Sequence, residues 1–149
     1  MKSKVNVSIT SVSSLNEIIQ GVEQVIRVRA FELYTNRGKQ PGRDLEDWQT
    51  ASAELLRQPL CAVAESEFQT TVEFYLTADE VRDTELLVTP QAVLLIGKTQ
   101  EGASGPRTRT FKLVSLQHPI DTSSLYADFN NGKLFCAANV TQSTLKATA

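Results

Sequence analysis

The residues best suited to nucleophilic catalysis are Cys136 and the single histidine, His118, which precedes Pro119. Together with Asp121 they would supply the thiol, base and carboxylate of a cysteine nucleophile site. Cys136, however, lies within an alternating apolar run, and the nearby sequence offers neither a helix N-terminus nor a basic cluster to lower the thiol pKa. A solvated turn histidine and a structural cysteine are the simpler interpretation, so we expect no enzymatic activity.

Residues that would bind a metal ion or a nucleotide are also sparse. Cys61 and Cys136 are far apart and form no C-x-x-C pair, the chain has one histidine, and its carboxylates do not cluster. The stretch EGASGPR at 101–107 fits neither G-x-G-x-x-G nor a phosphate-binding loop. We therefore expect no cofactor, no metal and two reduced thiols.

Length and composition narrow the class of protein further. The 149 residues, 41% of them hydrophobic, suffice for one domain, or for a domain of roughly 90 to 100 residues with an appendage. No apolar run approaches the ~18 residues that span a bilayer. The first 14 residues lack the features of a secretory signal. We expect a cytoplasmic protein without a membrane partner.

The first third of the chain has apolar residues at helical spacing. From Leu15 to Tyr34 they recur every three or four positions, which predicts an amphipathic helix. The stretch NRGKQPG at 36–42 follows. Its two glycines and its proline predict the end of this helix.

A second helix is predicted directly after this break. Asp44 is a suitable N-cap, and apolar residues at helical spacing continue to about Arg57, before Pro59. The sequence therefore predicts a helical hairpin over residues 15–57, preceded by a flexible tail over residues 1–14.

Basic residues on this hairpin raise the alternative of DNA binding. They are Arg27, Arg29, Arg37, Lys39 and Arg43. Two helices joined by a glycine-bearing turn are similar to a helix-turn-helix, although this connection is long for that motif. Acidic residues alternate with the basic ones, and the net charge of −2 argues against binding by bulk charge. We therefore expect no nucleic-acid partner.

After Pro59 the apolar pattern changes to a period of two. Seven short runs separated by turn signals predict strands at 60–66, 68–76, 85–89, 92–98 and 109–116, and on both sides of Asn130-Asn131-Gly132. This spacing is typical of an immunoglobulin-like antiparallel β-sandwich, here over residues 59–141, and of a mainly β protein. A flexible tail is expected at 142–149.

The last part of this region resembles a known family. RTFKLVSLQHPIDTSSLYADFNNGKLFCAANV, residues 109–140, is similar to the C-terminal half of the α-crystallin domain of small heat-shock proteins. The residues that carry this signature are Ala127, Asn131, Gly132 and Leu134. The stretches FQTTVEFYL, ELLVT and VLLIGKT follow the order of the family's earlier strands, so the resemblance covers about residues 60–141.

The front of the chain resembles a second family. IRVRAFELYTNRGKQPGRDLEDWQTASAEL, residues 26–55, is similar to a small bacterial helical domain of unknown function. The matching pattern is close to R-x-x-A-(Y/F)-x-x-(Y/W), followed by G-R-D-x-x-x-W-x-x-A-x-x-x-L. This second resemblance implies no chemistry.

The resemblance to small heat-shock proteins implies an ATP-independent chaperone, a holdase that binds partly unfolded polypeptides in a hydrophobic groove by strand addition. The groove residues that we expect on this basis are Leu86, Val88, Leu125, Ala127 and Phe129. The alternative is a non-enzymatic adaptor or co-chaperone that docks specific native partners, because a fold alone does not fix a function.

Assembly into large shells is not expected. The segment between Gly97 and Phe111 is too short for the loop that many bacterial members exchange, and 142–149 contains no Ile-x-Ile anchor. We expect a dimer or small oligomer that forms through the hairpin. The assembly residues that we expect are Ile18, Ile19, Val22, Val25, Ile26 and Trp48.

Overall fold

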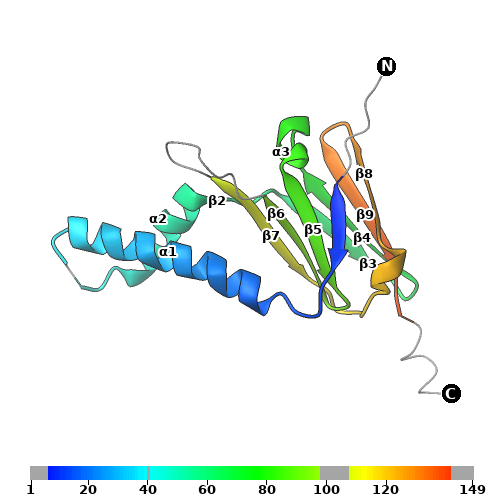
Figure 1. Cartoon of the computed structure of the whole chain (residues 1–149), viewed down its shortest axis with the longest axis horizontal. Helices are drawn as coiled ribbons and strands as arrows, with labels where there is room; N and C mark the ends of the chain where they lie inside the picture. The colour runs from blue at the N-terminus through cyan, green and yellow to red at the C-terminus, as the bar shows by residue number, and fades with distance from the viewer. Residues whose placement is uncertain (1–6, 40, 98–107, 142–149) are drawn as a thin grey trace.

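The chain folds into two packed β-sheets from which a helical hairpin projects (Figure 1). The computed structural model describes residues 7–39, 41–97 and 108–141. The predicted mainly β, two-sheet fold with an N-terminal helical hairpin is confirmed.

One sheet has five strands in the spatial order β1-β5-β6-β7-β2. Their bounds are Ser8–Ser11 for β1, Thr84–Thr89 for β5, Ala92–Gly97 for β6, Arg109–Ser115 for β7 and Leu56–Arg57 for β2. Strands β5, β6 and β7 pair antiparallel, whereas the edge strands β1 and β2 pair parallel with their neighbours. The five-stranded sheet therefore has a parallel strand at each edge, in addition to the antiparallel strands expected from the sequence.

The other sheet has four antiparallel strands in the order β3-β4-β9-β8. Their bounds are Cys61–Glu65 for β3, Gln69–Tyr75 for β4, Lys133–Asn139 for β9 and Tyr126–Asn130 for β8. The seven strands expected from the alternating pattern are thus β3 to β9. A 3-10 turn, η1, at Thr122–Ser124 leads into β8.

Strands β1 and β2 differ from the expectation. Residues 8–11 were expected in a flexible tail but form β1, and Leu56–Arg57 were expected at the end of a helix but form β2. Each segment forms backbone hydrogen bonds with an edge of the five-stranded sheet, β1 with β5 and β2 with β7. The local sequence does not reveal these partners. The expected tail at 142–149 lies outside the described residues.

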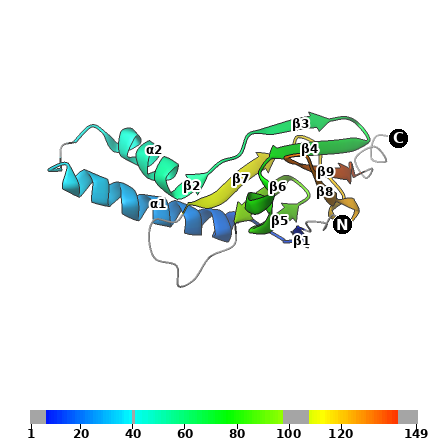
Figure 2. The ribbon, with the colours of Figure 1, turned by 90° about the horizontal axis from the view of Figure 1, so that it is seen from above.

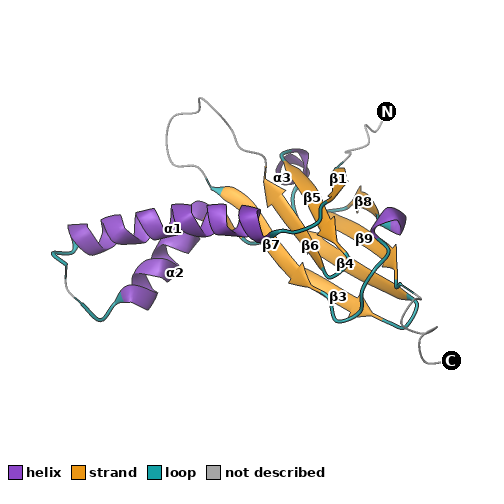
Figure 3. Cartoon of the chain, turned by 60° about the horizontal axis from the view of Figure 1, so that its bottom comes forward, coloured by secondary structure: helices purple, strands orange, loops and turns teal. Residues whose placement is uncertain are grey.

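The hairpin consists of α1, Asn16–Asn36, and α2, Asp44–Leu55. Gly38 and Gly42 between them adopt positive φ angles of 85° and 90°, which glycine reaches without a steric penalty. Figure 3 shows the first part of α1 beside the sandwich and its last part extending away from it.

A short third helix, α3 at Ala78–Arg82, was not expected. The Thr77 hydroxyl accepts a hydrogen bond from the Glu80 N–H, and the Glu80 carboxylate accepts one from the Thr77 N–H, both at 3.1 Å. This capping box, written T-x-x-E in the sequence, satisfies two backbone donors at the start of the helix.

Two apolar clusters lie on opposite faces of the five-stranded sheet. The inner cluster fills the space between the sheets around Phe74, Leu86 and Leu95. The outer cluster packs Val22 and Ile26 of α1, with other hairpin residues, against the opposite face. Strands β5 and β6 are therefore buried on both faces, which explains their continuous rather than alternating apolar sequence.

Candidate protein-interaction surfaces

The five expected groove residues come together in the inner cluster, near the β5 and β8 edges of the sandwich. Leu86 and Val88 on β5 are fully buried, with 0% of their surface exposed. Leu125, Ala127 and Phe129 are half-buried and pack against the same cluster. Leu86 and Val88 are thus core residues in this arrangement.

Strand β1 covers the β5 edge at this place. Ile9 lies opposite Leu86 and Ser11 opposite Val88, and the Val12 N–H donates to the Val88 carbonyl at 2.9 Å. Val7, just before β1, packs against the inner cluster. Figure 2 shows β1 and β8 on the same side of the sandwich. The groove expected for a partner is therefore covered by the chain's own extended segment.

Strand β1 is held by its backbone pairing with β5 and by the flanking residues Val7 and Val12, which pack against the inner and the outer cluster. All four of its residues are exposed, Ile9 at 37%. Within the described part of the chain, no side chain of Ser8–Ser11 makes a hydrogen bond or ion pair. Strand β1 was not expected from the sequence, although Val7 and Ile9 alternate with Ser8 and Thr10 as in a strand.

The expected turn between the last two strands is confirmed. Asn131 and Gly132 have φ angles of 51° and 79°. Positive φ at both central residues is what a two-residue type I′ hairpin turn requires. Ala127 pairs with Cys136 across β8 and β9, and Leu134 is 1% exposed in the inner cluster. Asn131 and Gly132 thus form the turn of the β8–β9 hairpin, and Ala127 and Leu134 pack the hairpin against the inner cluster.

The expected assembly residues lie mostly against the chain's own sheet. Val22 and Ile26 are buried, and Ile18, Ile19 and Trp48 are half-buried in the outer cluster. Val25, 57% exposed, faces away from that cluster. The apolar face of the hairpin thus covers Leu87, Leu94 and Ile96 on the outer face of the five-stranded sheet.

Two large apolar side chains are exposed toward the far end of the hairpin, one on each helix. Phe31 and Leu45 are 62% and 69% exposed, and the Phe31 ring lies 6.0 Å from the Tyr34 ring. At the same end of the hairpin, an ion pair between Arg37 and the buried Asp47 connects the end of α1 to the start of α2. The guanidinium group lowers the pKa of the Asp47 carboxyl group, because its hydrogen bonds favour the charged form.

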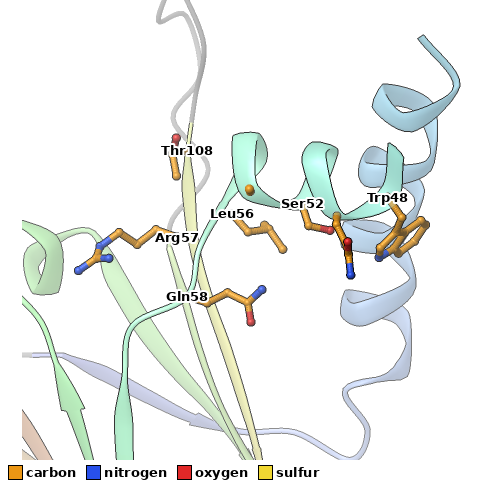
Figure 4. A pocket seen from close by; sticks show the side chains of 8 residues that line it. Trp48, Ser52, Leu56, Arg57, Gln58 and Thr108 are labelled. Carbon is orange, nitrogen blue, oxygen red and sulfur yellow. The ribbon is translucent and has the colours of Figure 1, made fainter. Parts of the chain in front are cut away.

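A shallow hollow is lined by residues of α2 and of the edge strand β2 that directly follows it (Figure 4). Its lining residues are Trp48, Gln49, Ser52, Ala53, Leu56, Arg57, Gln58 and Thr108. Arg57 forms an ion pair with Glu80 of α3, which raises the pKa of Arg57 and lowers that of Glu80. This ion pair therefore connects β2 to α3.

The candidate nucleophile, Cys136, is buried and separated from solvent. Cys136 is 1% exposed in the inner cluster, and this burial raises the pKa of its thiol to about 12. His118 and Asp121 are exposed; the His118 backbone N–H donates to Glu65, and the Asp121 carboxylate accepts from the Ser123 N–H at 3.0 Å. A thiol with that pKa is protonated at neutral pH, whereas the nucleophilic form of cysteine is the thiolate.

Over the described residues, no group of His, Cys, Asp and Glu is arranged to bind a metal ion. Among the described helices, none has the length and apolar character needed to cross a bilayer.

The hairpin matches a family model described as a protein of unknown function, DUF2934, over residues 22–57. This range falls within the helical domain of unknown function expected from the sequence. No curated protein matches the chain.

Several solved structures are similar to the chain. Heat shock protein 16.0 from Schizosaccharomyces pombe is 18% identical, with a TM-score of 0.46, over 57% of this chain and 88% of that one. HSP18.5 from E. histolytica is 12% identical, with a TM-score of 0.45, over 56% and 88%. The hspA protein from Xanthomonas axonopodis is 14% identical, with a TM-score of 0.45, over 56% and 94%. The two-sheet fold itself rests on the strand pairing described above.

Proposed function

We propose that the chain is an ATP-independent holdase of the small heat-shock type, which binds partly unfolded polypeptides at the β5 edge of the sandwich spanning residues 59–141. The observation that carries this proposal is β1. An extended segment with apolar side chains at alternate positions already lies on that edge, with Val7 against the inner cluster. This is the mode of peptide recognition called β-augmentation.

Exchange of β1 for a client segment needs no external energy source. The client replaces the backbone hydrogen bonds of β1 and the apolar contacts of Val7, so the interactions lost and gained are of the same kind. Few side-chain contacts oppose the release of β1. Unfolded chains expose extended apolar segments that native proteins bury, and this difference selects them as clients.

The direction of the backbone N–H groups in β1 provides a matched pair of variants. The Val12 N–H points to β5, and N–H groups alternate in direction along a strand. The Thr10 N–H therefore faces β5, and the Ser11 N–H faces away. Proline has no N–H, so Thr10→Pro removes a β1–β5 hydrogen bond and Ser11→Pro does not.

The test is suppression of aggregation of two or more unrelated clients, followed by light scattering. We expect the full chain to suppress aggregation without ATP, and Thr10→Pro to hold more client per mole than Ser11→Pro because the β5 edge opens more often. If the full chain protects no client, the holdase proposal is wrong. If the two variants hold equal amounts of client, the β5 edge is not the binding site.

The alternative function, an adaptor or co-chaperone for native partners, is favoured by the exposed Phe31 and Leu45 at the projecting end of the hairpin. A pull-down that returns one partner in fixed stoichiometry, and that fails with Phe31→Ala, would support this alternative. Many unrelated unfolded proteins in the same pull-down would support the holdase.

A further inference from the structure

Strand β3 is an edge strand with one open side. It pairs with β4 in the described sheet and ends the order β3-β4-β9-β8. The Leu60 carbonyl accepts from the Tyr75 N–H, and the Ser66 N–H donates to the Gln69 carbonyl, both at 2.9 Å. The backbone groups of Leu60 and Ser66 thus point toward β4. Successive residues of a strand point their N–H and C=O groups to opposite sides, so those of Cys61, Val63 and Glu65 point away from β4.

This edge lacks the features that normally prevent strands from associating. Residues 60–64 read Leu-Cys-Ala-Val-Ala, with no charge and no proline. Ala62, Val63 and Ala64 are all exposed, Val63 at 43%. The opposite edge strand of the same sheet, β8, carries the exposed Asp128 at its centre.

The single charge on β3 is already satisfied within the chain. The Glu65 carboxylate accepts hydrogen bonds from the Gln117 N–H at 3.0 Å and the His118 N–H at 3.1 Å. These bonds connect the end of β3 to the loop after β7 and keep the carboxylate off the open side. Glu65 therefore repels an approaching strand less than a free carboxylate would.

We propose that β3 pairs antiparallel with β3 of a second copy of the chain, about a two-fold axis through Val63. In this register Val63 faces Val63 of the second copy, Ala62 faces Ala64, and Cys61 faces Glu65. The three outward residues of each chain donate and accept, which gives about six hydrogen bonds between chains. The two four-stranded sheets become one continuous sheet.

The position of the Glu65 carboxylate favours this register and a second copy of the chain as the partner. A two-fold axis through Glu65 would place two carboxylates opposite each other, which is destabilising. The axis through Val63 instead places each Glu65 opposite a neutral Cys61 and uses the whole strand. The strand is self-complementary in length, in charge and in the small side chains that face each other, so a second copy fits this edge.

The size of the contact predicts a weak dimer. A five-residue strand is about 17 Å long, so its edge buries well below the ~800 Å² per partner that is usual in a stable complex. The dimer should therefore form reversibly at micromolar or higher concentrations. Figure 2 shows β3 on the far side of the sandwich from β1, so this contact does not depend on the proposed client site.

The test uses the full chain in sedimentation equilibrium over a range of concentrations. We expect a monomer–dimer equilibrium for the natural chain. Val63→Lys and Val63→Glu should each be monomeric, because like charges meet at the axis. Mixing the two variants in equal amounts should restore dimers, since opposite charges then face each other. Tyr126→Lys, which adds a charge to the exposed edge of β8, is the control and should dimerise like the natural chain.

Three results would overturn the proposal: a natural chain that is monomeric at all concentrations, dimers of Val63→Lys that match the natural ones, or a mixture that stays monomeric. If the charged variants fail to fold, Val63→Pro replaces them, because the Val63 N–H faces away from β4 and the sheet does not use it. Client holding by the Val63 variants is measured separately and should be unchanged.

Discussion

Ile26 is the residue through which the contact between the hairpin and the sandwich can be measured. It is 4% exposed and lies in the outer cluster between α1 and the five-stranded sheet. Ile26→Ala removes three buried carbon groups, a transfer loss of roughly 2.4 kcal/mol at ~0.8 kcal/mol each. The cavity left behind adds to this loss, and the higher helix propensity of alanine offsets a few tenths of a kcal/mol. We expect the free energy of unfolding to fall by about 3 kcal/mol.

Val25 provides the matched control, because it is the preceding residue on α1 and is 57% exposed. Val25→Ala should change the free energy of unfolding by less than about 0.5 kcal/mol. The assay is urea unfolding followed by the fluorescence of Trp48, the chain's one tryptophan, and by far-UV circular dichroism. Because the outer cluster couples α2 to the sheet, both signals should shift together. If Ile26→Ala costs no more than Val25→Ala, or if Trp48 unfolds separately, α1 is not packed on the sheet as described.

Three further predictions concern the turn, the ion pair and the thiols. Gly132→Val should lower the free energy of unfolding by roughly 1 to 3 kcal/mol, since a β-branched residue would occupy a φ of 79°; an unchanged melting temperature would contradict this. Asp47→Asn should destabilise the chain at neutral pH. The bond to Arg37 lowers the Asp47 pKa, so its stabilisation is present above the unfolded-state pKa of about 4 and is lost as pH falls through the folded-state pKa. Unfolding curves of both proteins should therefore converge in acid, and a constant difference would rule out the ion pair. In non-reducing buffer a thiol reagent should modify the half-buried Cys61 in the folded chain and Cys136 only after unfolding; immediate reaction of both thiols would place Cys136 outside the core.

The local sequence was sufficient for strands β3 to β9 and for the two hairpin helices because their signals are periodic. Alternation along Gln69–Tyr75 marks a strand with one buried face, and the turn at Asn131 and Gly132 follows from residues that tolerate positive φ. The end of α2 was placed about two residues too late, because nothing local distinguishes Leu56 and Arg57 as a strand. Their conformation depends on pairing with Arg109 and Thr110, more than 50 positions away.

The groove residues show where sequence reasoning reaches its limit. The resemblance grouped Leu86, Val88, Leu125, Ala127 and Phe129, and the structure does bring them together. Whether that edge is open depends on the position of residues 8–11. A four-residue exposed strand has almost no intrinsic stability, so its location is set by the unpaired edge that it meets.

Residue types and their periodicity thus determined a mainly β sandwich with a helical hairpin in front, and gave no sign of a catalytic or metal site. The tertiary structure decided three things: that the hairpin's apolar face covers the outer side of one sheet, that β1 covers the β5 edge, and that β3 has no second neighbour among the described strands. The physical reason is that an apolar side chain or a backbone N–H specifies only that it needs a partner. Which partner it finds is fixed by contacts between segments far apart in the chain.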